Sequence, residues 1–471
     1  MFSKVNKSGV AMLLKAIMLE EVPSYANKIF YSLGFLSMIS FFMLLITGLI
    51  MVFFGIDWWL TNSAGVFMRS IHLWSGQAFV VFMILHITIV FLTSGYKPPR
   101  RLVWVFGSLM FFLALIEAEF GYVLRNDFSA QWRSLQGADL YNGSGLGIFI
   151  NNLNYAQIYG IHIVLIPFII LGILFLHYGL VRLRGIAKPY RPDYKYRMVK
   201  ANHTVLFVRG FVLITVIILL AIIFPSPLIA PVTIKQIATE SPSTMAKTLL
   251  SEIDHSSDTA TYSDNIAPYQ FDTKKIYIDV PYLQYTANRI NQVNMLAIFD
   301  SEDKSTQTKN LKAAGDYFAK NGELTLIPNT KNPVLPLVSS LIYMAQSGLY
   351  EAALKNEANT GYNQTYALRF LSDAKVLEDK ANSLQITTAQ YGMLREETGI
   401  IPPGAWWLAP LGLIDNTILK NDPNQDRDGA EIIGTFMLIF IAFPYIPLIN
   451  QLPDKLKIYK LIWKDKDLER N

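Results

Sequence analysis

Four of the six histidines in this chain lie in pairs inside two long apolar segments. His72 and His86 stand fourteen positions apart in SIHLWSGQAFVVFMILHITIV, and His162 and His177 stand fifteen apart in YGIHIVLIPFIILGILFLHYGL. An α-helix turns by about 100° and rises about 1.5 Å per residue, so each pair falls near one helix face, with its members roughly 21 Å apart along the axis. Two such helices running in the same direction would bring His72 level with His162 and His86 level with His177.

Imidazole pairs that cross a helical bundle suit an iron held in haem, because a low-spin iron accepts two axial nitrogens. A zinc site would need three or four ligands in one cluster, not two pairs some 20 Å apart. A single histidine in a membrane helix more often forms a hydrogen bond between helices. Four histidines at matched depths favour two haem sites over that reading.

Glycines repeat the same interval on two other apolar segments. Gly34 and Gly48 are fourteen residues apart, as are Gly107 and Gly121. Glycine lets a flat ring approach the backbone closely, because it has no side chain. Glycines are common in membrane helices, but a shared interval on two helices supports the histidine pattern.

Composition places these segments in a membrane protein. The 471 residues are 52% hydrophobic, carry a net charge of +5 and include no cysteine. The missing cysteines exclude disulfides, thiolate zinc sites, cysteine-bound iron–sulfur clusters and covalently attached haem. Membrane proteins keep excess Lys and Arg in cytoplasmic loops, so the positive charge does not indicate nucleic-acid binding.

Six segments are apolar and long enough to cross a bilayer, which takes about 20 helical residues. They span approximately residues 29–53, 71–94, 102–122, 157–180, 206–231 and 432–450. No removable signal peptide is expected at the N-terminus. Residues Gly9–Met18 instead favour a short amphipathic helix at the membrane interface.

The loops predict the orientation. The connections after the second and fourth segments and the C-terminal tail are basic. The positive-inside rule therefore places both termini in the cytoplasm and loops 54–70 and 123–156 outside. Residues 235–400 hold 15 Lys and Arg against 19 Asp and Glu, which agrees with an extracytoplasmic position. Periodicity predicts that this insert is mostly helical, with SSDTATYSD as an extended stretch or loop.

The predicted fold class is an all-α membrane protein: a transmembrane four-helix dihaem bundle, two further transmembrane helices and a mostly helical extramembrane insert. The predicted divisions are the four-helix domain, the fifth transmembrane helix, the extracytoplasmic insert, and a C-terminal part with a pocket loop, the sixth helix and a cytoplasmic tail. Their bounds are residues 1–200, 201–234, 235–400 and 401–471.

These motifs resemble the cytochrome b family of quinol–cytochrome c and plastoquinol–plastocyanin oxidoreductases. The resemblance rests on the spaced histidines and the spaced glycines. It also rests on RSIHLW, which contains the first histidine, and on TSGYKPPRRLVWVFG, which follows the second. The fifteen-residue interval and the VRLRGI that follows are closer to the b6f type. The resemblance covers roughly residues 20–235 and resumes at 400–460, where FMLIFIAFPYIPLINQLPDKL is similar to the helix that closes the family's quinol pocket.

The resemblance implies two non-covalent b-type haems, an outer low-potential one and an inner high-potential one, with quinone or quinol as substrate. It further implies Rieske-type iron–sulfur or c-type cytochrome partner subunits, a dimer of cytochrome b subunits, and a bacterial or archaeal cytoplasmic membrane. The residues it points to are His72 and His162 for the outer iron, His86 and His177 for the inner iron, Arg69 for a haem propionate and Arg182 for the inner quinone site.

Several positions depart from the family pattern. Ser32 replaces the cysteine that anchors an extra haem in b6f-type proteins, and Gln157 replaces an arginine. The family's Pro-Glu-Trp-Tyr is best matched by GAWW, with Ala405 in place of the glutamate that accepts a quinol proton. Its GYxLPWG is GYVLRND here, with Arg125 and Asn126 in place of proline and tryptophan.

Glu117 and Glu119 are unusual carboxylates near the outer end of the third apolar segment. They could replace the missing glutamate as proton acceptors at a quinol site. Alternatively, they face the aqueous rim or pair with Arg125.

We interpret the chain as the dihaem cytochrome b subunit of a respiratory quinol:acceptor oxidoreductase. One alternative keeps the haems as a transmembrane electron conduit with a degenerate outer quinol site, paired with a second cytochrome b. Another is a haem-free six-helix protein whose outer domain is the functional part. His203 and His255 lie outside the two histidine pairs. We expect His203 to have a structural role at the membrane interface and His255 to be a solvated loop residue.

Overall fold

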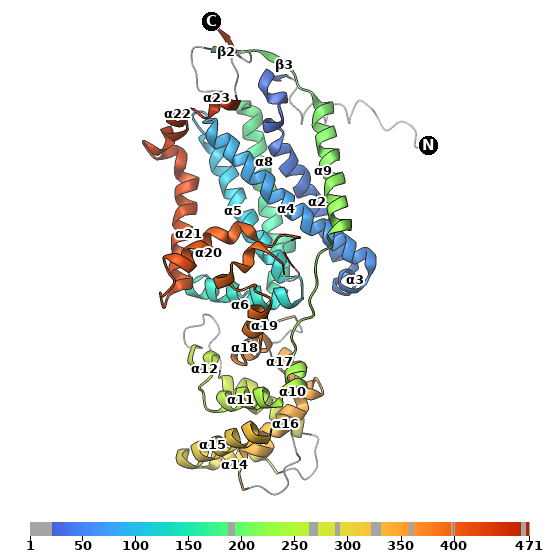
Figure 1. The fold of residues 1–471 in the computed structure, drawn as a ribbon, viewed down its shortest axis with the longest axis vertical. Helices are drawn as coiled ribbons and strands as arrows, with labels where there is room; N and C mark the ends of the chain where they lie inside the picture. The colour runs from blue at the N-terminus through green and yellow to red at the C-terminus, as the bar shows by residue number, and fades with distance from the viewer. Residues whose placement is uncertain are drawn as a thin grey trace, which may run out of the picture.

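The computed structural model describes residues 21–186, 194–262, 272–287, 293–321, 331–357, 362–396, 399, 401–462 and 468–470. In this part of the chain, long helices form a bundle, and a second helical unit lies at one end of that bundle (Figure 1). We call that end of the bundle the outer end and the opposite one the inner end, following the predicted topology. The expected interfacial helix Gly9–Met18 lies outside the described residues.

Six helices in the described residues are long and apolar enough to cross a membrane, which confirms the all-α membrane class. They are Leu33–Phe54, Ser63–Leu92, Arg101–Val123, Tyr155–Arg184, His203–Ile223 and Arg427–Tyr445. Two predicted spans have bounds that are wrong. The fifth helix ends at Ile223 rather than near 231, because Pro225 and Pro227 follow directly and proline cannot continue a helix. The sixth begins at 427 and ends at 445, before Pro447.

The bundle is built from two helix pairs. Helix α2 (Leu33–Phe54) packs along α4 (Ser63–Leu92), and α5 (Arg101–Val123) packs along α8 (Ile166–Arg184). Helix α9 (His203–Ile223) lies against α2 and α4.

At the other side of the bundle, α21 (Gln425–Ala442) lies against α5. The helices bury apolar side chains between them together with several polar ones, and many large apolar side chains also face outward, as expected where lipid replaces water.

The fourth span contains an irregular turn at the first of its histidines. Helix α7 (Tyr155–Gly160) continues through a π-helical turn, Ile161–Leu165, into α8. A π turn takes up one more residue than an α turn. It therefore absorbs the extra residue in the interval of fifteen between His162 and His177, and both imidazoles face α5.

Short elements close both ends. At the inner end, β1 (Glu21–Pro23) pairs with β3 (Met198–Lys200), and β2 (Tyr194–Tyr196) pairs with β4 (Leu468–Arg470), both antiparallel. Two short helices, α22 (Leu452–Leu456) and α23 (Tyr459–Ile462), also lie near this end.

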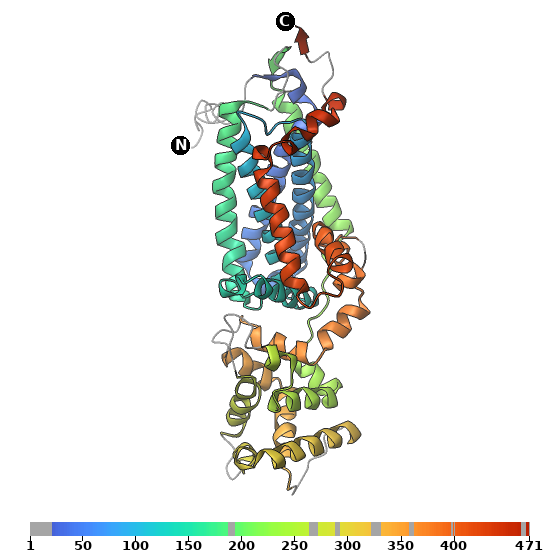
Figure 2. The same cartoon turned by 90° about the vertical axis from the view of Figure 1, so that its left-hand side faces the viewer.

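At the outer end, α6 (Phe128–Gly143) lies across the bundle (Figure 2). The short helix α3 (Ile56–Thr61) packs on α4, and α20 (Ala409–Thr417) precedes α21.

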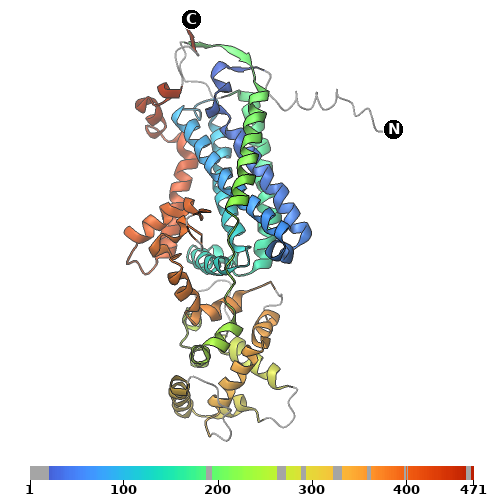
Figure 3. The same cartoon turned by 45° about the vertical axis from the view of Figure 1, so that its right-hand side comes forward.

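The second unit is the predicted insert, and its described residues are helical, as expected. An extended linker runs from the end of α9 to its first helix (Figure 3). Its helices are α10 (Ile234–Glu240), α11 (Pro242–Ile253), α12 (Asp258–Tyr262), α13 (Val280–Thr286), α14 (Met295–Ser301), α15 (Lys304–Asn321), α16 (Val334–Gln346), α17 (Leu349–Glu357), α18 (Thr365–Asp373) and α19 (Val376–Ser383). The expectation that SSDTATYSD is a loop is wrong for α12.

The insert docks on the loop before α7. Gln364 donates a backbone hydrogen bond to the Leu153 carbonyl over 2.9 Å, and Tyr155 donates one to the Tyr362 carbonyl over 3.1 Å. Arg369 pairs with Asp139 on α6 at 3.2 Å. Backbone and charged contacts thus hold the insert against the bundle.

Two carboxyl groups meet inside the insert. Glu252, at the end of α11, and Asp373, at the end of α18, lie close enough to share a hydrogen bond. Burial and the neighbouring Asp373 carboxylate raise the pKa of Glu252 from 4.5 to about 9. Ser257 donates a hydrogen bond to Glu252 Oε2 over 2.9 Å. A proton held between the two carboxyls therefore joins α11 to α18.

We predict that the stability of the insert falls as pH rises through the window between 4.5 and about 9. In this window the folded insert keeps a proton on Glu252 that the unfolded chain has released, so the free energy of unfolding falls by about 1.4 kcal/mol per pH unit. Glu252→Gln should flatten this dependence. Hydrogen exchange of α11 and α18, corrected for intrinsic rates, measures it, with Glu240→Gln as the control. An unchanged slope in Glu252→Gln would contradict the assignment.

Candidate functional site

The outer histidine pair joins α4 to the fourth span. The ring centres of His72 and His162 lie 6.4 Å apart, with ring planes 73° apart. His72 Nδ1 lies 2.8 Å from Thr47 Oγ1. His162 Nδ1 lies 2.9 Å from Glu117 Oε1 and 3.2 Å from the Glu117 carbonyl. Each Nδ1 is thus engaged by a neighbouring helix, which leaves the Nε2 atoms for a ligand.

The inner pair repeats this arrangement. His177 Nδ1 lies 3.0 Å from the carbonyl of Val103 on α5. His86 lies close enough to His177 for a charge on one ring to act on the other. Along α4, His86 follows His72 by fourteen residues, or about 21 Å. The structure therefore brings together the pairs that the sequence predicts.

Each imidazole lies against one of the predicted glycines. A Cβ atom on Gly121 would lie 3.0 Å from His162 Cε1, and one on Gly107 would lie 3.0 Å from His177 Cε1. The corresponding distances are 3.4 Å from Gly48 to His72 and 3.1 Å from Gly34 to His86. Larger residues at these four positions would push the rings away from the helices.

This geometry fits an iron between two imidazoles. With metal–nitrogen bonds of about 2 Å, as imidazole makes to zinc, two rings on opposite sides of one metal have centres roughly 6 Å apart. The observed separation of His72 and His162 is 6.4 Å. Within the described residues, no group of three or more His, Cys, Asp or Glu is placed to hold a metal ion, so the zinc alternative finds no support there.

The two predicted arginines lie at opposite ends of the bundle. Arg69 is one turn before His72, is 6% exposed and donates to the Ser226 carbonyl over 3.0 Å. Arg182 lies in the last turn of α8, at the inner end.

The two glutamates of α5 point in different directions. They are two residues apart, so their side chains are rotated by about 200° about the helix axis. Glu117 contacts His162 inside the bundle. Glu119 lines a cavity below α5 and is acted on by the charge of Arg133. The carboxylates described against Arg125 are Asp127 and Glu396, so the alternative in which the two glutamates pair with Arg125 finds no support in these contacts.

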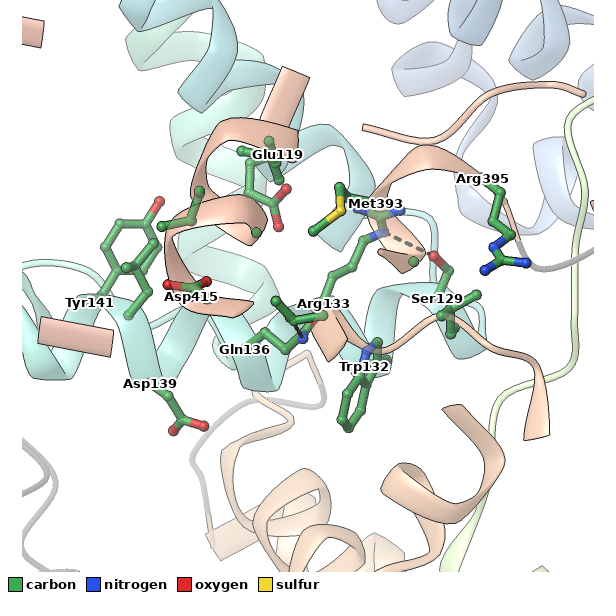
Figure 4. A pocket seen from close by; sticks show the side chains of 18 residues that line it. Glu119, Ser129, Trp132, Arg133, Gln136, Asp139, Tyr141, Met393, Arg395 and Asp415 are labelled. Carbon is green, nitrogen blue, oxygen red and sulfur yellow. Dashed lines mark hydrogen bonds between the residues drawn. The ribbon is translucent and has the colours of Figure 1, made fainter. Parts of the chain in front are cut away.

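The cavity lies at the outer end, between α5, α6, the 386–395 segment and α20. Its volume is ≈ 220 Å³, and its walls include Glu119, Trp132, Arg133, Tyr141 and Met393 (Figure 4). Glu119 Oε2 is buried and has no hydrogen-bond partner among the described residues. The cavity thus combines apolar and charged side chains in its walls with one unsatisfied carboxylate oxygen.

A buried ion cluster positions the chain around this cavity. Arg125 contacts Glu396 Oε2 at 2.5 Å and Asp127 Oδ2 at 2.7 Å, and it donates to the Pro227 carbonyl over 2.9 Å. Glu396 is 1% exposed, and Asp127 is fully buried. Arg125 therefore ties together the start of α6, the linker that leaves α9 and the segment that returns from the insert.

The GAWW loop is held by a glutamine that the sequence analysis missed. Gln77 on α4 donates to the carbonyls of Pro403 and Gly404 over 3.0 and 3.1 Å and accepts from Trp406 Nε1 over 2.9 Å. Ala405 is fully buried beside these contacts. In the sequence, this contact is signalled by a polar glutamine that stands among apolar residues of a membrane span.

Glu396 and Arg133 were also missed. The partner of Glu396, Arg125, comes from a distant part of the chain, whereas Arg133 contacts Ser129 on its own helix and Tyr122 at the end of α5.

Comparisons with known proteins find a family match within the first half of the chain. Residues 77–231 match the family profile described as Cytochrome b(N-terminal)/b6/petB. Cytochrome b6 of Heliobacterium modesticaldum is 31% identical over 203 residues, which cover 38% of this chain and 95% of the relative. Cytochrome b6 of Acaryochloris marina is 28% identical over 190 residues, covering 36% and 88%. A chain of the solved structure named Hyperthermophilic respiratory Complex III aligns at 16% identity with a TM-score of 0.37, covering 73% of this chain and 96% of that chain.

Arg125→Met should lower the free energy of unfolding by about 3–5 kcal/mol, because it leaves Asp127 and Glu396 buried without a counter-charge. Thermal unfolding of the detergent-solubilised chain measures the effect. The matched control is Lys375→Met, which removes the exposed pair with Asp258 and should cost at most about 1 kcal/mol. Equal and small effects of both substitutions would show that the cluster is not buried as described.

Proposed function

The chain belongs to the cytochrome b family, and from that premise we propose that it is the dihaem cytochrome b subunit of a respiratory complex that exchanges electrons with a quinone pool. The observation that carries the proposal is the arrangement of four imidazoles in two layers, with the outer ring centres 6.4 Å apart. Each ring lies on a glycine surface. Each pair could supply the two axial nitrogens of one haem iron, with one pair near each end of the bundle.

His72 and His162 would hold the outer haem iron, and His86 and His177 the inner one. When bound, the two haems would carry single electrons across the membrane. Thr47, Glu117 and Val103 engage the Nδ1 atoms of three of these histidines, which keeps their Nε2 atoms directed toward the irons.

Arg69, buried one turn from His72, would pair with a propionate of the outer haem.

The outer cavity would receive the head group of a quinol. Its ≈ 220 Å³ is below the 300–1,000 Å³ of pockets for whole drug-sized ligands, but it is enough for a single ring. Oxidation of a quinol to a quinone releases two electrons and two protons. Glu119 is placed to accept one of these protons, because its Oε2 is free within the cavity wall.

The remaining parts of the proposal concern the inner end and the partners. An inner quinone site would lie near Arg182. Because the chain has no cysteine to hold such a centre itself, a Rieske-type iron–sulfur or c-type cytochrome subunit would receive electrons at the outer end, where the insert would dock it. The complex would be a dimer of cytochrome b subunits in a bacterial or archaeal cytoplasmic membrane, with both termini in the cytoplasm and the insert outside.

A second candidate function is favoured by Ala405. This residue is fully buried where the family has its proton-accepting glutamate, and alanine cannot take up a proton. In this alternative the chain conducts electrons across the membrane and a second cytochrome b oxidises quinol.

Redox titration of the purified chain should reveal two b-type haems. His162→Ala should abolish the outer haem and leave the inner one, and His177→Ala should do the reverse, because each removes one of two axial ligands. Reduced-minus-oxidised spectra count the haems. A chain without a b-type α band would contradict the proposal and support the haem-free alternative.

Glu119→Gln should slow quinol oxidation at the outer end by about 10²–10⁴-fold, because glutamine cannot accept the proton. Stopped-flow reduction of the haems by quinol, with an inner-site inhibitor present, measures this rate. Asp139→Asn is the control, since Asp139 also lines the cavity but already pairs with Arg369. If outer-site inhibitors have no effect on the unaltered protein, the conduit alternative is correct.

A further inference from the structure

One of the proposed iron ligands has a charged partner. Glu117 Oε1 lies 2.9 Å from His162 Nδ1. The partner of His177 is a backbone carbonyl, and the partners of His72 are the Thr47 hydroxyl and the Leu44 backbone. Thr47 donates its own proton to the Met43 carbonyl over 2.7 Å, so its oxygen accepts from His72. Among these three histidines, the outer pair thus holds the one with a carboxylate.

The contact is built into the helix pair. Glu117 lies four residues before Gly121 on the same face of α5, and Gly121 lets the His162 ring approach the helix. The Glu117 side chain is 15% exposed, and its Oε2 is buried without a hydrogen-bond partner among the described residues. Its hydrogen bond to His162 is therefore poorly screened by water.

This placement separates Glu117 from the cavity chemistry. The lining of the outer cavity includes Glu119 but not Glu117, so the two carboxylates cannot be interchangeable proton acceptors.

A carboxylate that accepts a hydrogen bond from the Nδ1–H of a metal-bound imidazole fixes the ring orientation and raises the basicity of the bound nitrogen. A more basic axial nitrogen stabilises the ferric state relative to the ferrous state, which lowers the reduction potential.

We propose that Glu117 is a positioning residue that gives His162 partial imidazolate character and thereby sets the outer site at a lower reduction potential than the inner site. The inference rests on the proposed dihaem function. It assigns to one side chain a contribution to the difference in potential that would favour electron flow from the outer to the inner end.

The test compares two Glu→Gln variants of the full-length chain, Glu117→Gln and Glu119→Gln. Both remove a carboxylate from the same turn of α5, but only the first touches a ligand. Redox titration at one fixed pH should show that Glu117→Gln shifts the outer ferric-to-ferrous equilibrium at least tenfold, or about 59 mV upward for one electron. The inner haem and both haems of Glu119→Gln should keep their potentials.

Three outcomes would overturn the inference. The first is an unshifted outer haem in Glu117→Gln. The second is an equal shift in both variants, since that would show a general effect of charge. If Glu117→Gln loses the outer haem, Glu117→Asp, which retains the carboxylate, should restore it with a potential nearer that of the unaltered chain. The third outcome is therefore loss of the outer haem in Glu117→Asp as well. Absence of both haems from the unaltered chain would instead refute the proposed function.

Discussion

Close contact between an imidazole ring and a glycine surface is the constraint on which the bundle depends. Each of the four contacts needs a helix without a side chain at one position and a histidine at the matching height on its neighbour. The contacts join α2 to α4 and α5 to the fourth span, and the proximity of His72 and His162 joins the two pairs. The π turn at Ile161–Leu165 follows from the same demand, because fifteen α-helical residues would rotate the second histidine of this span away from its glycine.

The outer end depends on a buried charge cluster. Arg125 stands where the family has proline, and its guanidinium contacts both the segment that enters the insert, at Pro227, and the segment that leaves it, at Glu396. A long insertion between the fifth helix and the pocket loop would otherwise leave that loop loosely attached. The departure at Arg125 and the presence of the insert are therefore physically connected, and Gln77 adds a second attachment to the loop.

The two glutamates of α5 show how one helical turn can serve two environments. A separation of two residues sends their side chains in nearly opposite directions. Glu117 reaches an imidazole within the bundle, and Glu119 reaches the cavity between α5 and α6. In the proposed function, Glu117 would lower the reduction potential of the outer site and Glu119 would receive a proton from quinol.

The sequence by itself determined the features that repeat with a helical period or depend on composition. These are the six spans, the two histidine pairs, their glycines and the exclusion of cysteine-bound cofactors. Helix geometry makes such residues share a face whatever the rest of the chain does. Only the tertiary structure decided which residues meet across long separations. The pairs Arg125–Glu396 and Gln77–Pro403 join distant segments, and the separate roles of Glu117 and Glu119 depend on what α8 and α6 place beside α5. No local sequence pattern predicts these contacts, because the two partners come within hydrogen-bond distance only when the chain is packed.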